Sequence, residues 1–271
     1  MQSQLTPFLR TVASAPQVLL LLDYDGTLAP FHTQRDRAFP YPGVEHVLQE
    51  IVRNGRTRVV VITGRDAPDV LSLLNIHPRP EIWGGYGLQR LRTDGSMEMP
   101  HLDEQTLQGL SNADRWLRDQ KLHHTAECKA ASIAVHWRGL SKSDADDLRG
   151  RILLGWRCIA GASALGLLEF DGGLEIRSPG ADKGNAVRML LNEVKLPLPA
   201  AYLGDDATDE SAFRVMRDRG LGVLVRPTSR QTAAQLWLKP PDELLDFFRQ
   251  WLKACSRHDT SNLSAAAAVN E

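Results

Sequence analysis

The stretch from Val18 to Thr27, VLLLLDYDGT, joins an apolar run directly to a loop that contains two aspartates. A short, continuous apolar run is typical of a strand buried on both faces of a parallel sheet. Two later segments have the same form, VVVITGR from Val59 to Arg65 and AYLGDD from Ala201 to Asp206. Ligands bind outside the carboxyl ends of parallel strands, so we expect the polar residues after these strands to meet in one site.

Strand and helix patterns alternate in the first hundred residues and again after residue 180, which predicts a doubly wound parallel sheet of the Rossmann-like α/β class. Hairpins and helices in the middle predict an inserted α+β domain. We therefore expect a core of residues 1–100 and 177–255, an inserted cap of residues 101–176 and a flexible tail of residues 256–271. The expected strands are 18–22, 58–62, 82–83, 132–137, 165–170, 174–178, 201–203 and 221–225, with a hairpin at 88–99. The expected helices are 44–54, 66–74, 102–122, 144–154, 183–194, 209–218 and 241–253.

The composition argues against several classes of protein. The chain has 271 residues, of which 42% are hydrophobic, so it is long and apolar enough to form a buried core. A formal net charge of −1 lacks the basic excess of a dedicated nucleic-acid binder. No early apolar run reaches the roughly 20 residues of a membrane span, and we expect no signal peptide. Three cysteines without CxxC spacing argue against a disulfide framework or a zinc ribbon, so we expect a cytoplasmic protein.

The aspartates that follow the strands require a cation among them. Asp23 and Asp25 at one strand end, and Asp205 and Asp206 at another, would repel one another strongly in a cleft of low dielectric constant. Carboxylate oxygens favour Mg²⁺, which retains several waters and binds through one or two carboxylates together with a substrate phosphate. The pattern therefore predicts a magnesium-dependent site for a phosphate compound.

Two other residues suit the oxygens of a phosphate group. Lys183 opens a helix as a point charge, and the Thr63 hydroxyl can donate a hydrogen bond. Taken singly, Thr63 could cap the next helix, Lys183 could be a solvated lysine, and the acidic residues 205–209 could favour a helix N-terminus. Their joint occurrence at four strand or helix ends favours the catalytic interpretation.

This set of residues resembles the signature of the haloacid-dehalogenase superfamily of phosphotransferases. The matching segments are Asp23-Tyr24-Asp25-Gly26-Thr27, Thr63, Lys183 and Gly204-Asp205-Asp206. The resemblance implies that the Asp23 carboxylate attacks phosphorus and forms an aspartyl-phosphate that water hydrolyses. It also implies that Asp25 protonates the leaving alkoxide and later deprotonates the water.

The same resemblance implies the groups that hold the phosphate and the metal. The implied phosphate-binding residues are Thr63, Gly64 and Lys183. The implied ligands of Mg²⁺ are Asp23, the main-chain carbonyl of Asp25, and Asp205. Asp206 and Asp209 are implied to support these ligands without binding the metal themselves.

Three further segments are similar to the trehalose-6-phosphate phosphatase family. They are GDDATDESAF at 204–213, Glu127-Cys128-Lys129 followed by IAVHWR at 133–138, and LEIR at 174–177. The resemblance implies hydrolysis of trehalose 6-phosphate to trehalose and phosphate, with a cap that closes over the core and excludes water. The residues implied to hold the sugar are Arg65, Glu127, Lys129, Arg138 and Glu175, with Arg65 near the phosphate or the sugar.

Other interpretations stay open at this point. One is a phosphatase of the same superfamily for another sugar phosphate or a glycosyl-glycerate phosphate, and another is a catalytically weak regulator that binds a sugar phosphate. Tyr86 stands where the family commonly has histidine. Glu127 and Lys129 could form a cross-strand ion pair on a solvated sheet face. We expect a monomer, and the resemblance implies a functional partnership with a trehalose-phosphate synthase.

Overall fold

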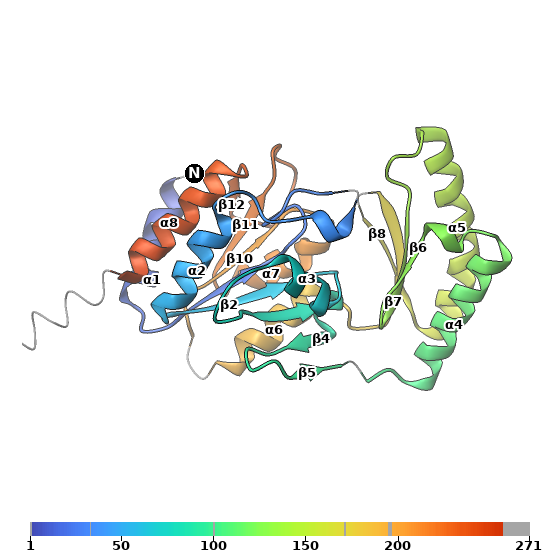
Figure 1. The fold of residues 1–271 in the computed structure, drawn as a ribbon, viewed down its shortest axis with the longest axis horizontal. Coiled ribbons are helices and arrows are strands. Elements are labelled where there is room, and N and C mark those ends of the chain that lie inside the picture. Colours follow the sequence, from blue (N-terminus) through green and yellow to red (C-terminus); the bar gives the residue numbers. More distant parts are fainter. Residues whose placement is uncertain (1, 33, 100, 171, 195–196, 257–271) are drawn as a thin grey trace, which may run out of the picture.

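The computed structural model of the protein describes residues 2–32, 34–99, 101–170, 172–194 and 197–256, which form two β-sheets (Figure 1). The strands of the larger sheet are β1 (Val18–Leu22), β2 (Thr57–Ile62), β3 (Glu81–Gly84), β4 (Gln89–Leu91), β5 (Met97–Glu98), β10 (Ala200–Gly204), β11 (Leu221–Val225) and β12 (Leu236–Leu238). The strands of the smaller sheet are β6 (Ala126–Cys128), β7 (Ser132–His136), β8 (Gly166–Phe170) and β9 (Gly173–Arg177). We call the larger sheet with its helices the core, and the smaller sheet with helices α4 (Glu104–Asp119) and α5 (Lys142–Ser163) the cap.

The core sheet has the strand order β12-β11-β10-β1-β2-β3-β4-β5. Neighbouring strands from β12 to β3 are parallel, whereas β4 and β5 extend the sheet antiparallel. The core helices are α1 (Gln2–Ser14), α2 (Val44–Asn54), α3 (Ala67–Leu73), α6 (Lys183–Glu193), α7 (Glu210–Met216) and α8 (Asp242–Ser256). Helices α1, α2, α3 and α8 pack on one face of the sheet, and α6 and α7 pack on the other. This arrangement confirms the predicted doubly wound α/β core.

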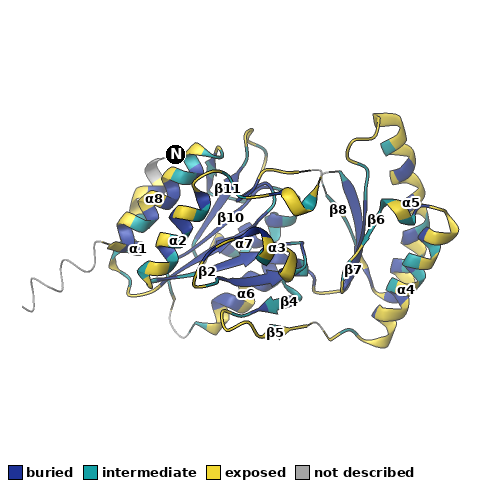
Figure 2. Cartoon of the chain, in the orientation of Figure 1, coloured by how far each residue is buried: buried dark blue, intermediate teal, exposed yellow. Residues whose placement is uncertain are grey.

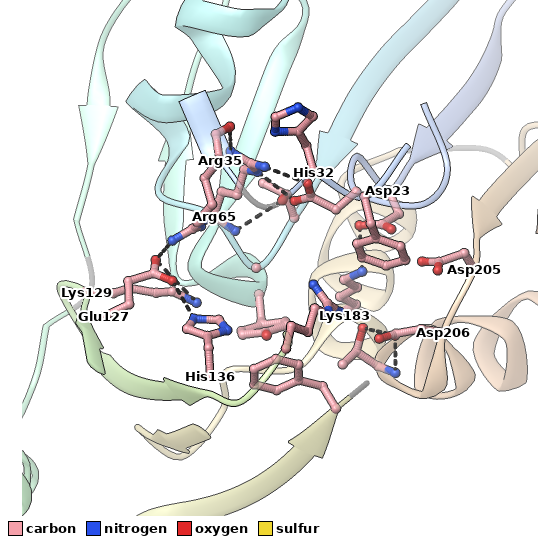
Figure 3. A pocket seen from close by; sticks show the side chains of 18 of the residues that line it. Asp23, His32, Arg35, Arg65, Glu127, Lys129, His136, Lys183, Asp205 and Asp206 are labelled. Carbon is pink, nitrogen blue, oxygen red and sulfur yellow. Dashed lines mark hydrogen bonds and ion pairs between the residues drawn. The ribbon is translucent and has the colours of Figure 1, made fainter. Parts of the chain in front are cut away.

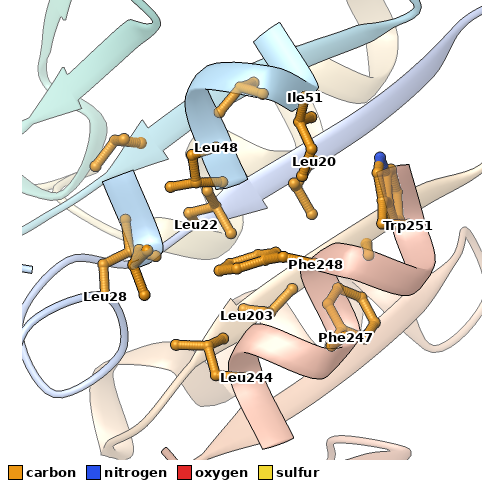
Figure 4. Packing of buried hydrophobic residues seen from close by; sticks show 14 of the residues in the cluster. Leu20, Leu22, Leu28, Leu48, Ile51, Leu203, Leu244, Phe247, Phe248 and Trp251 are labelled. Atoms are coloured by element: carbon orange, nitrogen blue, oxygen red, sulfur yellow. The ribbon is translucent and has the colours of Figure 1, made fainter. Parts of the chain in front are cut away.

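Strand β1 lies in the middle of the core and is buried along its whole length. Leu20 and Leu22 pack in the cluster that contains Phe248 of α8, as Figure 4 shows. Leu19 and Leu21 belong to the cluster on the opposite face. Because both faces of β1 meet helices, its sequence is continuously apolar and shows no alternation.

Local signals in the sequence mark the ends of several core elements correctly. Helix α2 ends at Gly55, which adopts a left-handed conformation with φ of 77°. The predicted hairpin is formed by β4 and β5. Its turn is fastened by Asp94, whose carboxylate accepts hydrogen bonds from the main-chain N–H and the hydroxyl of Ser96.

The cap is an antiparallel sheet of order β6-β7-β9-β8 with α4 and α5 on its outer face (Figures 1 and 2). Ile133 and Val135 of β7 pack with Trp156 of α5 in the cap's own hydrophobic cluster. The opposite face of the sheet, which includes Ala134, turns toward the core. The cap therefore presents one sheet face to the carboxyl ends of the core strands.

The structure also contains elements that the sequence patterns do not predict. Strands β6 and β12 have three residues each, too short for a periodic signal, and α1 contains Pro7, a residue that disfavours a helix interior. Helix α5 continues to Ser163, beyond the expected end at residue 154. Strand β9 continues to Arg177, one residue past the expected end of the cap. The predicted tail beyond Ser256 lies outside the described residues.

Among the helices of the described ranges, none combines the length and apolar character that a membrane crossing would need.

Candidate active site

A cavity of about 530 Å³ lies between the core strand ends and the inner face of the cap sheet (Figure 3). Its volume is within the range of small-molecule sites. The core contributes Asp23, Asp25, Phe31, His32, Arg35, Thr63, Gly64, Arg65, Tyr86, Lys183, Asp205, Asp206 and Thr208. The cap contributes His124, Thr125, Ala126, Glu127, Lys129, His136, Arg138 and Phe170.

Lys183 joins two carboxylates at the base of this cavity. Its Nζ atom lies 2.6 Å from Asp23 Oδ1 and 2.8 Å from Asp209 Oδ1. All three residues are buried, with at most 3% of their surface exposed. Asp182 caps α6 through its side chain, which fixes Lys183 as the first residue of the helix. The lysine therefore couples the end of β1 to the loop after β10.

Asp209 organises the loop that follows β10. Its carboxylate accepts hydrogen bonds from the Tyr202 hydroxyl and from the main-chain N–H groups of Asp205 and Asp206, the latter two at 2.9 and 3.0 Å. Asp206 is the N-cap of the 3₁₀ turn η4 (Ala207–Asp209) that follows. Because Lys183 and these three donors already engage Asp209, this residue holds the loop and does not face the cavity.

Burial governs the titration of this cluster. Burial raises the pKa of Asp23 to about 8; Lys183 opposes this shift and Asp209 adds to it. Burial, together with Asp23 and Asp209, raises the pKa of Asp205 well above its usual value. Burial alone would lower the pKa of Lys183, but Asp209 and Asp23 raise it, so the lysine stays charged. One lysine therefore faces more carboxylates than it can neutralise, and the cluster favours a further cation.

The donor set fits a magnesium ion. Carboxylate oxygens of Asp23, Asp205 and Asp209 lie within 4.8 Å of one another. Gly26 has φ of +82°, and a Cβ atom there would lie 2.3 Å from Asp205 Oδ2, so only glycine permits this close approach. Since Asp209 is engaged elsewhere, Asp23 and Asp205 are the carboxylates available to a hard, oxygen-preferring cation.

Arg65 binds Asp25 in a bidentate ion pair. Its Nε atom lies 2.6 Å from Asp25 Oδ2, and its Nη2 atom lies 2.6 Å from Asp25 Oδ1. The Nη1 atom donates to the main-chain carbonyl of Arg35 at 2.7 Å. Asp25 and the buried Arg65 thus line the cavity as an ion pair.

Thr63 and Gly64 form a tight turn after β2. The Thr63 hydroxyl accepts a hydrogen bond from the main-chain N–H of Arg65 at 3.1 Å. A Cβ atom on Gly64 would lie 2.6 Å from Tyr86 Cζ, so the tyrosine packs directly on this glycine. Tyr86 itself has a positive φ of 58° in the 3₁₀ turn η2 (Gly85–Gly87). Tyr86, which stands where the family commonly has histidine, therefore packs from within the core against the turn after β2.

Glu127 and Glu175 flank Ala134 on the inner face of the cap sheet. Lys129 Nζ lies 2.9 Å from Glu175 Oε1, and Ser132 donates to the same oxygen at 2.6 Å. Burial acts to raise the pKa of Glu175, but Lys129 and Ser132 outweigh it and lower the pKa, so Glu175 is ionised. Glu175 is fully buried and does not line the cavity, whereas Lys129 does. Glu175 therefore positions the lysine from behind.

His136 is a neutral, hydrogen-bonded residue of this face. Its Nε2 atom lies 3.1 Å from Glu127 Oε2. Burial, assisted by Lys129 and Arg35, lowers the pKa of His136 to about 4. The neutral ring also packs edge-on against Phe170, with 5.5 Å between centroids. His136 is therefore a packed and hydrogen-bonded residue of the cap sheet.

Arg35 connects the core to the cap. It belongs to the 3₁₀ turn η1 (Arg35–Arg37) of the core, and its guanidinium forms an ion pair with Glu127. A second contact across the cavity places the Arg138 guanidinium 4.5 Å from the ring centre of Phe31. Through Phe31 and Arg35, the loop after β1 therefore contacts the cap on the other side of the cavity.

The structure brings most of the predicted site residues to one cavity. Those that line it are Asp23, Asp25, Thr63, Gly64, Arg65, Glu127, Lys129, Arg138, Lys183, Asp205 and Asp206. The other two, Glu175 and Asp209, lie directly behind cavity residues. Sequence analysis missed Phe31, His32 and Arg35 because their loop carries no motif. The sequence feature that could have pointed to this loop is its position directly after Asp23-Tyr24-Asp25, at the end of β1.

A family model described as Trehalose-phosphatase matches residues 21–242 of the chain. The chain belongs to the trehalose-phosphatase family. It is 28% identical over 268 residues to the probable trehalose-phosphate phosphatase 3 of Oryza sativa, covering 89% of this chain and 71% of that protein. It is 30% identical over 246 residues to the trehalose-phosphate phosphatase of Mycobacterium tuberculosis, covering 86% of this chain and 61% of that protein. This family consists of phosphoric monoester hydrolases, and the chain is an enzyme of that class.

Solved structures share the fold of this trehalose-phosphatase family member. The C-terminal domain of Candida albicans trehalose-6-phosphate phosphatase aligns with a TM-score of 0.78 at 18% identity, covering 92% of this chain and 97% of that one. A haloacid dehalogenase-like hydrolase from Bacteroides thetaiotaomicron aligns with a TM-score of 0.60 at 16% identity, covering 86% and 99%. The resemblance to the haloacid-dehalogenase fold is therefore confirmed.

Replacing Asp205 with asparagine should alter how the stability of the metal-free protein depends on pH. The folded pKa of Asp205 is raised above 3.8, so as pH rises the unfolded chain loses this proton first and folding becomes less favourable. The Asp205→Asn variant lacks this penalty. Between pH 5 and pH 8, the unfolding free energy of the variant minus that of wild type should therefore rise by up to about 1.4 kcal/mol per pH unit.

Urea unfolding in a chelator between pH 5 and pH 8 measures the effect. Millimolar Mg²⁺ should raise the unfolding free energy of wild type at pH 8 and leave the variant nearly unchanged. Parallel pH profiles for the two proteins would show that the pKa of Asp205 is not raised in the folded protein, and would contradict this prediction.

Proposed function

We propose that this protein hydrolyses trehalose 6-phosphate to trehalose and phosphate through an aspartyl-phosphate intermediate, with Mg²⁺ as its cofactor. The observation that carries the proposal is the shared cavity. Asp23 and Lys183 of the core face the same space as Glu127 and Lys129 of the cap. A phosphate group and a sugar bound together would meet both sets of residues.

The nucleophile of the proposed reaction is the Asp23 carboxylate. An oxygen of Asp23 attacks phosphorus in line with the sugar oxygen, the P–O bond to the sugar breaks, and the phosphoryl group is transferred to Asp23. Lys183 holds Asp23 at 2.6 Å and brings positive charge to the phosphoryl oxygens. The Thr63 hydroxyl and the main-chain N–H of Gly64 would bind the remaining oxygens.

Asp25 would supply the proton transfers. Its carboxyl group protonates the leaving sugar oxygen and then takes a proton from the water that attacks the aspartyl-phosphate. The bidentate contact with Arg65 holds this carboxyl at the cavity wall. The two hydrogen bonds from Arg65 would loosen when Asp25 takes up the proton and re-form when the proton is released.

Mg²⁺ would be held by Asp23, Asp205 and the main-chain carbonyl of Asp25. When bound, the ion supplies charge neutralisation for the phosphoryl group among the clustered carboxylates. Asp209 would keep Asp205 in place through the N–H groups of the loop that it binds. Asp206 would act by starting the turn that contains Asp209.

The cap would recognise the sugar. Glu127, Lys129 and Arg138 present charged acceptors and donors to the cavity, and such groups form paired hydrogen bonds with neighbouring hydroxyls. Glu175 would contribute by holding Lys129. The Arg35–Glu127 ion pair would fasten the cap over the core and restrict the entry of water.

We also propose a cytoplasmic location, from the state of the cysteines. Cys128, Cys158 and Cys255 are all free thiols, which suits the reducing cytoplasm. A monomeric state and a functional partnership with a trehalose-phosphate synthase stay predictions from the family resemblance.

The substrate proposal predicts a strong preference within a panel of phosphate esters. With Mg²⁺, release of phosphate from trehalose 6-phosphate should exceed that from glucose 6-phosphate and from a glucosylglycerate phosphate by at least about tenfold in kcat/KM. Chelation of the metal should abolish the activity. Equal rates on all esters would contradict the substrate assignment, and absence of hydrolysis with sugar-phosphate binding retained would favour a regulatory role.

Glu127→Gln should impair use of the sugar while sparing the phosphorus chemistry. Loss of charged hydrogen bonds should raise KM for trehalose 6-phosphate about 10–100-fold. Hydrolysis of p-nitrophenyl phosphate, which carries no sugar, should change less than about threefold. The matched control is Glu169→Gln, on β8 and outside the cavity lining. Equal losses on both substrates would contradict a role for Glu127 in holding the sugar.

A further inference from the structure

A second group of ligand-type side chains lies in the cap, on the side of β6 that faces away from the active-site cavity. Asp114 belongs to α4, His123 begins the 3₁₀ turn η3 (His123–Thr125), and Cys128 is the last residue of β6. One carboxylate oxygen, one imidazole nitrogen and the thiol sulfur of these residues lie within 4.8 Å of one another. We propose that this group binds a divalent transition-metal ion of the Zn²⁺ type.

The spacing of the three atoms is close to that of a tetrahedral zinc site. Asp114 Oδ1 lies 3.0 Å from His123 Nε2 and 3.8 Å from Cys128 Sγ. Zinc bonds of about 2.0 Å to oxygen and nitrogen and about 2.3 Å to sulfur place tetrahedral ligand atoms roughly 3.3–3.6 Å apart. Small side-chain adjustments would bring all three atoms onto one ion, and water would occupy the fourth position.

The atoms that would bind the ion are available for it. His123 Nε2 is shielded from solvent, and its partner among the described residues is Asp114 Oδ1, which also accepts a hydrogen bond from the Cys128 thiol. The other carboxylate oxygen of Asp114 is held at 3.0 Å by Arg118 Nε, which leaves Oδ1 directed at the group. Cys128 is a free and exposed thiol, so the site has a path from solvent.

The chemistry of the ligands selects the class of metal. Mg²⁺ and Ca²⁺ prefer oxygen ligands, whereas a set of thiolate, imidazole and carboxylate suits Zn²⁺. Binding would convert the Cys128 thiol to a thiolate and release its proton to solvent. This preference distinguishes the group from the all-carboxylate cluster of Asp23, Asp205 and Asp209.

The alternation of side chains along β6 separates the two sites. Glu127 faces the cavity and pairs with Arg35, while the next residue, Cys128, faces α4. The proposed ion would therefore fasten β6 to α4 and η3 without entering the cavity. The proposal is independent of the phosphatase activity and can fail or succeed alone.

Protection of thiols in the wild-type chain tests the proposal without any substitution. The full chain is treated with iodoacetamide in a phosphine reductant and excess Mg²⁺, with and without a small molar excess of Zn²⁺. Mass spectrometry then follows Cys128 and Cys158, which is also exposed. Zn²⁺ should slow modification of Cys128 at least about tenfold and leave Cys158 unchanged. Unprotected Cys128, or equal protection of both thiols, would overturn the proposal.

Substitution of Co²⁺ for Zn²⁺ identifies the ligands by spectroscopy. Wild type and the control Cys158→Ser should show sulfur-to-cobalt charge-transfer absorption at one equivalent of Co²⁺. Cys128→Ser should lose this absorption, and His123→Ala should weaken Co²⁺ binding by more than about tenfold. An unchanged band in Cys128→Ser would contradict the site, and the wild-type thiol experiment decides if the variants do not fold.

Discussion

The active site depends on one buried ammonium group. Lys183 sits between Asp23 and Asp209, and none of the three has appreciable contact with solvent. Removing one partner from such a group leaves an uncompensated buried charge, which is strongly unfavourable. The triad therefore fixes three separate segments together: the end of β1, the start of α6 and the loop after β10. Asp205 and Asp206 are placed by this arrangement, because Asp209 accepts hydrogen bonds from their main-chain N–H groups.

The two halves of the cavity have different physical character. The core side is built on strand ends and helix starts, where main-chain positions are rigid and suited to phosphoryl transfer. The cap side is one face of a small sheet, where Glu127 and Lys129 are held by His136, Glu175 and an ion pair from the core. In the proposed reaction the core would supply the chemistry and the cap would recognise the sugar, across the same cavity.

Much of the core site could be predicted from the sequence because parallel strands bring their carboxyl ends to one edge of the sheet. The strand ends at Asp23, Thr63 and Asp205 meet for this reason. The place of Glu175 could not be predicted, since alternation along a strand does not reveal whether a side chain faces a cavity or lies behind it. Arg35 was missed because only tertiary packing brings its turn to Glu127.

In the proposed mechanism Asp23 forms a covalent bond to the phosphoryl group, and rapid quenching can trap that bond. Wild-type enzyme with Mg²⁺ is mixed with trehalose 6-phosphate labelled on phosphorus, quenched in acid within one turnover and digested. The account predicts label on the peptide that contains Asp23, and none in the Asp23→Asn variant. Label on another residue, or turnover in wild type without covalent label, would contradict it.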